Sequence, residues 1–121
     1  MSAMRVLVVD DDEEMRALLR TTLADFVVEE ASTGEIALRL LRHSPVDLVV
    51  LDWKLPGSWG SQVLDVLKAR YPSLPVLVLT VQTQLHNRLL AESLGADAYL
   101  TKPFHVAELL ATVRSLLKDR G

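Results

Sequence analysis

The stretch LVVLDWKLPG, residues 48–57, places the carboxylate of Asp52 directly after four consecutive apolar residues. A short run that is rich in β-branched residues and does not alternate with polar ones is typical of a parallel strand, which is covered on both faces. Ligands of open parallel sheets bind beyond the carboxyl ends of the strands. The stretch therefore predicts a buried strand that presents Asp52 at the functional edge of a sheet.

Four more runs of strand length occur along the chain, at residues 6–9, 27–28, 76–79 and 98–100. Apolar residues at helical intervals of three and four fill the segments between and after the strands, at residues 15–26, 36–41, 63–71, 85–94 and 106–117. Gly95 is predicted to end the fourth of these helices as a left-handed cap. Because strand and helix alternate five times, the sequence predicts an α/β fold with a doubly wound, five-stranded parallel sheet.

Length and charge limit the kind of protein that this chain can be. The 121 residues fit one domain, predicted over residues 1–121, and half of them are hydrophobic, as in an ordinary globular protein. A net charge of −3 argues against direct nucleic-acid binding by this domain, and the absence of cysteine excludes disulfide and thiol chemistry. With neither a membrane-length apolar run nor a secretory signal, the expected location is the cytoplasm, away from the membrane.

Polar side chains follow four of the five predicted strands. Asp10 and Asp11 come after the first strand, Asp52 closes the third, Thr80 closes the fourth and Lys102 follows the fifth. If the sheet has the flavodoxin-like strand order 2-1-3-4-5, the first and third strands are neighbours. Asp10, Asp11 and Asp52 are then predicted to converge at one edge of the sheet.

Other charged residues near the strand ends give no indication of a chemical role. Asp12 is predicted to be the N-cap of the first helix, with Glu13 and Glu14 favoured there by the helix dipole. Glu29 and Glu30 close the second strand, and the sequence indicates no role for them.

Three neighbouring carboxylates repel one another, so at least one should have a raised pKa unless a cation joins them. Mg²⁺ prefers oxygen ligands and is commonly held by one or two carboxylates together with a phosphate. A lysine opposite neutralises the remaining charge, and a threonine hydroxyl can donate a hydrogen bond to an incoming oxygen. The chain has no GxxxxGK[ST] loop to cradle a nucleotide phosphate, so the alternative is that Asp52 itself accepts a phosphoryl group as a nucleophile.

Four segments resemble, in order and at the right separations, the receiver domain of bacterial two-component response regulators. They are VLVVDDDEEMR at residues 6–16, LVVLDWKLPG at 48–57, VLVLT at 76–80 and GADAYLTKPF at 95–104. The resemblance covers essentially the whole chain. It implies a phosphorylation-dependent signalling switch that is not an enzyme and has at most slow self-catalysed phosphorylation and dephosphorylation.

The resemblance also implies a role for each residue at the predicted edge. Asp52 would accept a phosphoryl group from a sensor histidine kinase. Asp11 and Asp52 would bind Mg²⁺ directly, Asp10 would bind it through water, and Lys54 would contribute its backbone carbonyl.

The switch function would depend on three further residues. Thr80 would bond a phosphoryl oxygen, Lys102 would pair with the phosphoryl group, and Tyr99 would follow by changing rotamer. The resemblance further implies a cis peptide bond between Lys102 and Pro103.

The segment AELLATVRSLLKDR, residues 107–120, resembles the fifth helix of regulators that carry a winged-helix DNA-binding domain. In these regulators phosphorylation drives homodimerisation through the fourth helix, the fifth strand and the fifth helix. Arg88, Asp97 and Arg114 are candidates for that face, although solvated helix surface explains the two arginines equally well. The expected output is transcription, and the chain is either a complete single-domain regulator or a receiver separated from a DNA-binding domain.

Three features near the site depart from the pattern of the family: Ser58 and Trp59 before Gly60, Val81 after Thr80, and Lys54 and Gln82 two residues beyond Asp52 and Thr80. Val81 stands after the switch threonine, where a smaller residue is usual, and its bulk predicts a narrower path to Asp52. Trp53 is predicted to pack beside the acidic pocket, whereas Trp59 either packs over the rim or stays exposed as a partner anchor.

Two other classes of protein stay open. The first is a flavodoxin-like binding domain without phosphorylation, in which the carboxylates are only capping and structural groups. The second is a phosphohydrolase that forms an aspartyl phosphate. Such enzymes usually carry a second aspartate two residues after the nucleophile, and Lys54 occupies that place here.

Overall fold

The computed structural model describes residues 3–55, 58–81 and 85–118. Its main sheet contains five parallel strands in the order β2-β1-β3-β6-β7, with β1 at Arg5–Val9, β2 at Val27–Ala31, β3 at Leu48–Asp52, β6 at Val76–Thr80 and β7 at Ala98–Thr101. The helices are α1 at Glu13–Thr22, α2 at Gly34–His43, α3 at Gly60–Arg70, α4 at Leu85–Ser93 and α5 at Val106–Lys118. The predicted α/β fold and its flavodoxin-like order are confirmed.

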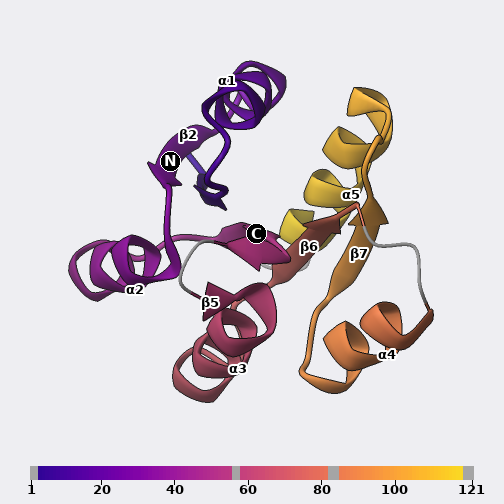
Figure 1. Ribbon diagram of the computed structural model, residues 1–121. Helices are drawn as coiled ribbons and strands as arrows, with labels where there is room; N and C mark the ends of the chain where they lie inside the picture. Colours follow the sequence, from indigo (N-terminus) through magenta and orange to yellow (C-terminus); the bar gives the residue numbers. More distant parts are fainter. Residues whose placement is uncertain (1–2, 56–57, 82–84, 119–121) are drawn as a thin grey trace.

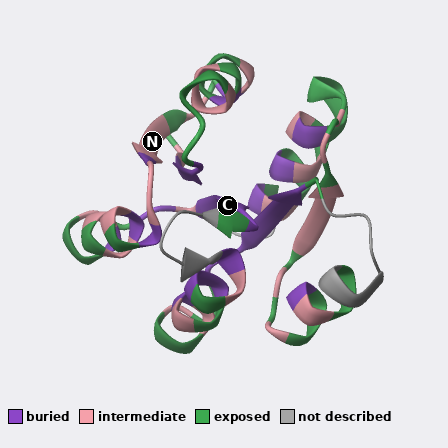
Figure 2. Cartoon of the chain, viewed as in Figure 1, coloured by how far each residue is buried: buried purple, intermediate pink, exposed green. Residues whose placement is uncertain are grey.

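The helices cover both faces of the sheet, with α1 and α5 on one face and α2, α3 and α4 on the other (Figure 1). Successive residues of a strand point to opposite faces. In β1, Val6 and Val8 therefore pack in the core under α1 and α5, whereas Leu7 and Val9 pack in the core under the other three helices. Both β3 and β6 are buried over their whole length, as Figure 2 shows for the centre of the sheet.

The first helix is shorter and the second strand longer than predicted. α1 ends at Thr22, and Leu23 follows as its C-cap, with its backbone outside the helical conformation and its amide bonded to the carbonyl of Leu19. Phe26 lies beyond a further turn, and its side chain packs against the same core as α1 although the helix has ended. β2 extends to Ala31 because it pairs with β1 along the full length of both strands.

A two-stranded antiparallel ribbon, which was not predicted, follows β3. Its strands are β4 at Lys54–Leu55 and β5 at Ser58–Trp59, and Lys54 pairs with Trp59. The side chain of Trp59 lies outside the described part of the structure, so the two alternatives for it stay predictions.

Local details of the helix ends agree with the sequence. The side chain of Asp12 caps α1 by accepting a hydrogen bond from the amide of Glu14 at 3.1 Å. Gly95 follows α4 with a φ of +100°, the left-handed conformation that glycine adopts at low cost. The peptide bond between Lys102 and Pro103 is cis. None of the helices in the described ranges has the length and apolar character that crossing a membrane requires.

Candidate functional site

Parallel pairing of β1 with β3 brings the acidic residues together at the carboxyl edge of the sheet. Asp10 is 1% exposed and Asp52 is 7% exposed, whereas Asp11 is exposed to solvent. One carboxylate oxygen from each of the three lies within 4.8 Å of the other two. The convergence expected from the strand order is therefore present.

Lys102 reaches this cluster from the end of β7. Its Nζ lies 3.1 Å from Oδ2 of Asp10 and 3.5 Å from Oδ1 of Asp52, and its side chain is only 15% exposed. The main-chain amide of Lys102 donates to the carbonyl of Thr80 at 2.6 Å, which ties it to β6. One ammonium group thus faces two buried carboxylates, so the cluster keeps excess negative charge.

Burial raises the pKa of Asp52 from an ordinary value of 3.8 to about 6, and the nearby negative charge of Asp10 adds to the rise. The positive charge of Lys102 opposes it, as does the amide of Lys54, which lies 3.4 Å from Oδ1 of Asp52. An ionised Asp52 is therefore costly at neutral pH when no cation is bound. A metal ion beside the carboxylates would remove that cost.

The raised pKa predicts an unusual pH dependence of stability in the presence of a metal chelator. The folded protein holds the Asp52 proton up to about pH 6, but the unfolded chain releases it near pH 4. Stability contributed by this group should therefore fall as the pH rises between these values, by about 2 kcal/mol after allowance for solvent screening. Urea unfolding of Asp52→Asn should lack this contribution, so the variant should be more stable than the wild type at pH 7. Equal stability of the two proteins at pH 7 would contradict the expectation.

Thr80 and Tyr99 form the other side of the site. Thr80 ends β6 and is only 2% exposed, and Tyr99 stands in the neighbouring strand β7. The two side chains share a hydrogen bond. Burial raises the pKa of Tyr99 above its ordinary value, against the effects of the Arg88 charge and of the hydrogen bond with Thr80. Tyr99 therefore keeps its hydroxyl proton at neutral pH and links the β6 edge to β7.

The donor set fits Mg²⁺. All three converging groups are carboxylates, the hard oxygen ligands that this ion prefers. Asp11 is exposed, which leaves room for water molecules in the coordination sphere. Trp53, directly after Asp52, is 3% exposed and packs in the core under α3, and its predicted place beside the acidic pocket stays a prediction. Because Trp53 directly follows Asp52 in the chain, we expect its fluorescence to report changes at the cluster.

Val81, by contrast, is 62% exposed. Its side chain lies largely in solvent, and its predicted effect on the path to Asp52 stays a prediction.

The three candidates for an interaction face each have a partner within the chain. Arg88 pairs with Glu92 on α4, and Arg114 of α5 pairs with Asp25 at 3.1 Å. Both are exposed ion pairs of the kind that contributes little to stability. Asp97 is more firmly held, because its Oδ2 accepts hydrogen bonds from the amide of Val76 at 2.8 Å and from Nζ of Lys68 at 2.7 Å. A role of the three in dimerisation stays a prediction.

Arg16 is a residue of the site that sequence reasoning missed. Its Nη1 donates to the main-chain carbonyl of Asp10 at 2.7 Å, so it contacts the backbone of the acidic cluster. The only signal in the sequence was its place at the end of VLVVDDDEEMR.

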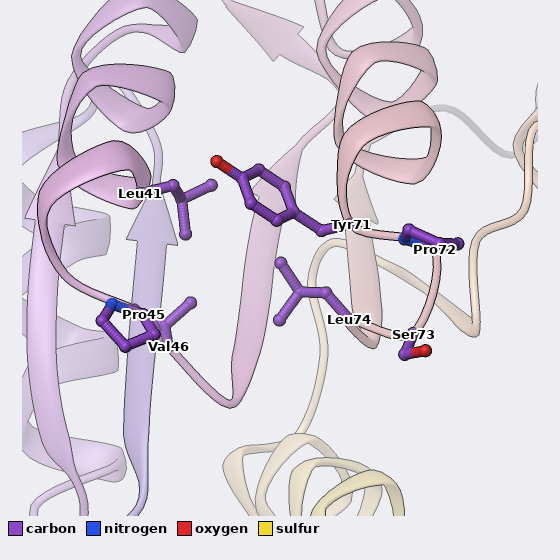
Figure 3. A pocket seen from close by; sticks show the side chains of 7 residues that line it. All are labelled: Leu41, Pro45, Val46, Tyr71, Pro72, Ser73 and Leu74. Carbon is purple, nitrogen blue, oxygen red and sulfur yellow. The ribbon is translucent and has the colours of Figure 1, made fainter.

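An apolar cavity of about 270 Å³ lies between the C-terminal ends of α2 and α3, at the edge of the sheet where the strands begin (Figure 3). Its lining consists of Leu41, Pro45, Val46, Tyr71, Pro72, Ser73 and Leu74. No carboxylate or basic side chain is among these residues. The cavity is therefore unsuited to a phosphoryl group or Mg²⁺, and the acidic cluster is the candidate site.

Comparisons with known proteins agree with this geometry. Residues 6–114 match the family model of the response regulator receiver domain. The chain is 41% identical to the transcriptional regulatory protein PrrA of Mycobacterium leprae over 99% of its own length, and 42% identical to the response regulator MprA of Mycobacterium sp. (strain KMS) over 94%. It covers 52% and 50% of these proteins, so it spans about half the length of the curated relatives that it matches.

Solved structures show the same fold. The receiver domain of the Francisella response regulator 1452 superposes with a TM-score of 0.91 at 31% sequence identity, over 98% of this chain and 99% of that one. The family model, these relatives and the strand order agree, and the chain therefore belongs to the response regulator receiver domains of two-component signalling systems, a regulatory family.

Proposed function

We propose that residues 1–121 form one receiver domain in which Asp52 accepts a phosphoryl group from a sensor histidine kinase, with Mg²⁺ bound beside it. The observation that carries the proposal is the meeting of Asp10, Asp11, Asp52 and Lys102 at one edge of the sheet. A side-chain oxygen of Asp52 attacks phosphorus while the bond from phosphorus to the kinase histidine nitrogen breaks. From a phosphohistidine that is protonated on its other ring nitrogen, the products are an aspartyl phosphate and a neutral histidine.

The other residues of the site position and neutralise the phosphoryl group. Asp11 and Asp52 would hold Mg²⁺ directly, with Asp10 acting through water and Lys54 through its backbone carbonyl. The bound ion would neutralise charge on the transferring oxygens. Lys102, already between two carboxylates, pairs with the phosphoryl group once Asp52 carries it. The same groups support at most slow self-catalysed phosphorylation and dephosphorylation.

The hydrogen bond between Thr80 and Tyr99 offers a route from the site to the surface. When Thr80 turns to the phosphoryl oxygen, Tyr99 loses that partner and changes rotamer. Tyr99 lies in β7, which contacts α4 and whose residues Ala98 and Leu100 pack against the core under α5, so the change alters the face formed by these three elements. We propose that this face, with Arg88, Asp97 and Arg114 as candidates, forms a phosphorylation-dependent homodimer.

The output we propose is control of transcription. PrrA of Mycobacterium leprae is named as a transcriptional regulatory protein, and 99% of the present chain aligns with it. The net charge of −3 favours a receiver that does not itself bind nucleic acid. DNA binding would then belong to a separate domain.

Intact mass spectrometry tests the acceptor directly. The purified protein, incubated with acetyl phosphate and Mg²⁺, should gain one phosphoryl adduct, and the adduct should be absent both in EDTA and from Asp52→Asn. Tryptophan fluorescence should change with Mg²⁺ and again with beryllofluoride. An unmodified wild type that also shows no response to Mg²⁺ would favour a binding domain without phosphorylation, whereas steady turnover of phosphate esters would favour a hydrolase.

A further inference from the structure

The side chain of Arg16 joins three parts of the chain behind the carboxylate cluster. It is only 14% exposed, and its Nη1 donates to the carbonyl oxygen of Asp10 at 2.7 Å. Its Nε lies 3.3 Å from Oε1 of Glu30 in β2, and its Nη2 pairs with Glu13 in the first turn of α1. One guanidinium group thus connects the end of β1 with α1 and with β2.

The backbone of Asp10 is fixed from both sides. Its amide donates to the carbonyl of Ala31 at 3.0 Å, and its carbonyl accepts from Arg16. Its Oδ1 accepts from the amide of Asp12 at 2.9 Å, which closes the turn that follows β1. The carbonyl held by Arg16 belongs to the peptide that leads into Asp11, so rotation of this peptide would displace both neighbouring carboxylates.

We propose that Arg16, held in place by Glu30, is a positioning residue for Mg²⁺ binding by Asp10 and Asp11. The inference rests on the proposed function, because it assigns Arg16 an effect on the ion of that same site. Arg16 acts through the peptide between the two aspartates and does not contact the ion. Glu30, for which the sequence indicated no role, acts one step further away.

The chemistry of arginine suits this arrangement. Its planar guanidinium offers five donors in a fixed geometry, so it can serve a carbonyl and two carboxylates at once. Glu13 and Glu30 also neutralise its charge, which limits its direct repulsion of a cation. A lysine at this position would keep the charge and could reach one acceptor, but it would not bridge all three.

Arg20 provides a matched control on the same helix. It also pairs with Glu30, but its side chain is 51% exposed, and the bond to the Asp10 carbonyl comes from Arg16. Removing either arginine therefore deletes one positive charge and one contact to Glu30. The contacts of Arg16 with the Asp10 backbone and with Glu13 distinguish the two.

The test compares Arg16→Gln, Arg16→Lys and Arg20→Gln with the wild type. Loss of groups that orient metal ligands typically weakens metal binding at least tenfold, so Arg16→Gln should raise the Mg²⁺ dissociation constant, measured by tryptophan fluorescence, about tenfold. Arg16→Lys should show an intermediate value and Arg20→Gln the wild-type value. In EDTA, the amides of Asp10 and Asp12 should exchange hydrogen faster in Arg16→Gln, provided that circular dichroism shows a folded protein.

Phosphorylation by acetyl phosphate at varied Mg²⁺ separates positioning from general damage. In Arg16→Gln the half-saturating Mg²⁺ concentration should rise about tenfold, while the rate at saturating Mg²⁺ should stay within about twofold of wild type. An unchanged dissociation constant, an equal change in Arg20→Gln or a rate that saturating Mg²⁺ does not restore would overturn the inference. If the wild type itself neither binds Mg²⁺ nor becomes phosphorylated, the proposed function fails instead.

Discussion

Replacement of Gly60 by alanine should destabilise the protein by about 3 kcal/mol or more, the upper part of the range for overpacking in a dense core. Gly60 is the first residue of α3, where alanine would ordinarily favour the helix by up to about 1 kcal/mol. The surroundings reverse that sign. A Cβ at this position would lie 2.7 Å from the main-chain oxygen of Asp52 and 2.7 Å from Cα of Trp53. The amide of Gly60 is also hydrogen-bonded to the carbonyl of Trp53. The backbone cannot yield without moving α3 or the end of β3.

Urea unfolding monitored by circular dichroism measures this effect, and Gly95→Ala is its control. Gly95 has a φ of +100°, but the Cβ of alanine there would meet only the flexible side chain of Lys68, at 3.1 Å. Its cost should be limited to about 1–2 kcal/mol for the left-handed backbone. Gly60→Ala should also slow phosphorylation by acetyl phosphate, since the displaced segment carries Asp52. A Gly60→Ala protein as stable as the wild type would show that α3 is free to move away from β3.

The fold could be predicted from the sequence because its signals are local and repeated. Unalternated runs such as residues 48–51 predict strands, and all five predicted strands are present. Burial on both faces is confirmed for β3 and β6, whereas the edge strands β2 and β7 are only partly buried. The boundaries of α1 and β2 were less accurate. Phe26 fits the helical spacing of α1, but it follows a turn after the helix and packs against the same core. Glu29 and Glu30 are partly buried charged residues in the edge strand β2, so the sequence showed too short a strand there.

The acidic cluster could also be predicted, because each of its members lies at the end of a strand and the flavodoxin-like strand order makes these two strands neighbours. Arg16 and Gly60 could not be. Arg16 acts through a side-chain bond to a main-chain carbonyl, and Gly60 is required by a close approach of two backbones. Neither kind of contact leaves a periodic signal in the sequence, so both needed coordinates.

Replacement of Lys102 by methionine should slow phosphorylation by acetyl phosphate about 100-fold, the usual effect of removing one electrostatic contact to the reacting oxygens. Methionine has a similar shape and length, so it should fill the same space. The same variant should bind Mg²⁺ more tightly than the wild type. Nζ of Lys102 lies 3.1 Å from Asp10 and 3.5 Å from Asp52, so the ammonium and the ion compete for the same carboxylates. Slower transfer together with tighter metal binding distinguishes loss of a counter-charge from loss of the fold.

Arg114→Met is the control for the Lys102 variant. It also deletes a cation that is paired with a carboxylate, but Arg114 and Asp25 are exposed, with side chains 57% and 78% accessible. Neither the transfer rate nor the Mg²⁺ affinity should change in it, since exposed ion pairs are screened by water. The pKa of Asp52, measured by NMR in EDTA, should rise above about 6 in Lys102→Met, because the Lys102 charge lowers it in the wild type. Weaker Mg²⁺ binding by Lys102→Met would show that the ammonium supports the carboxylates rather than competing with the ion.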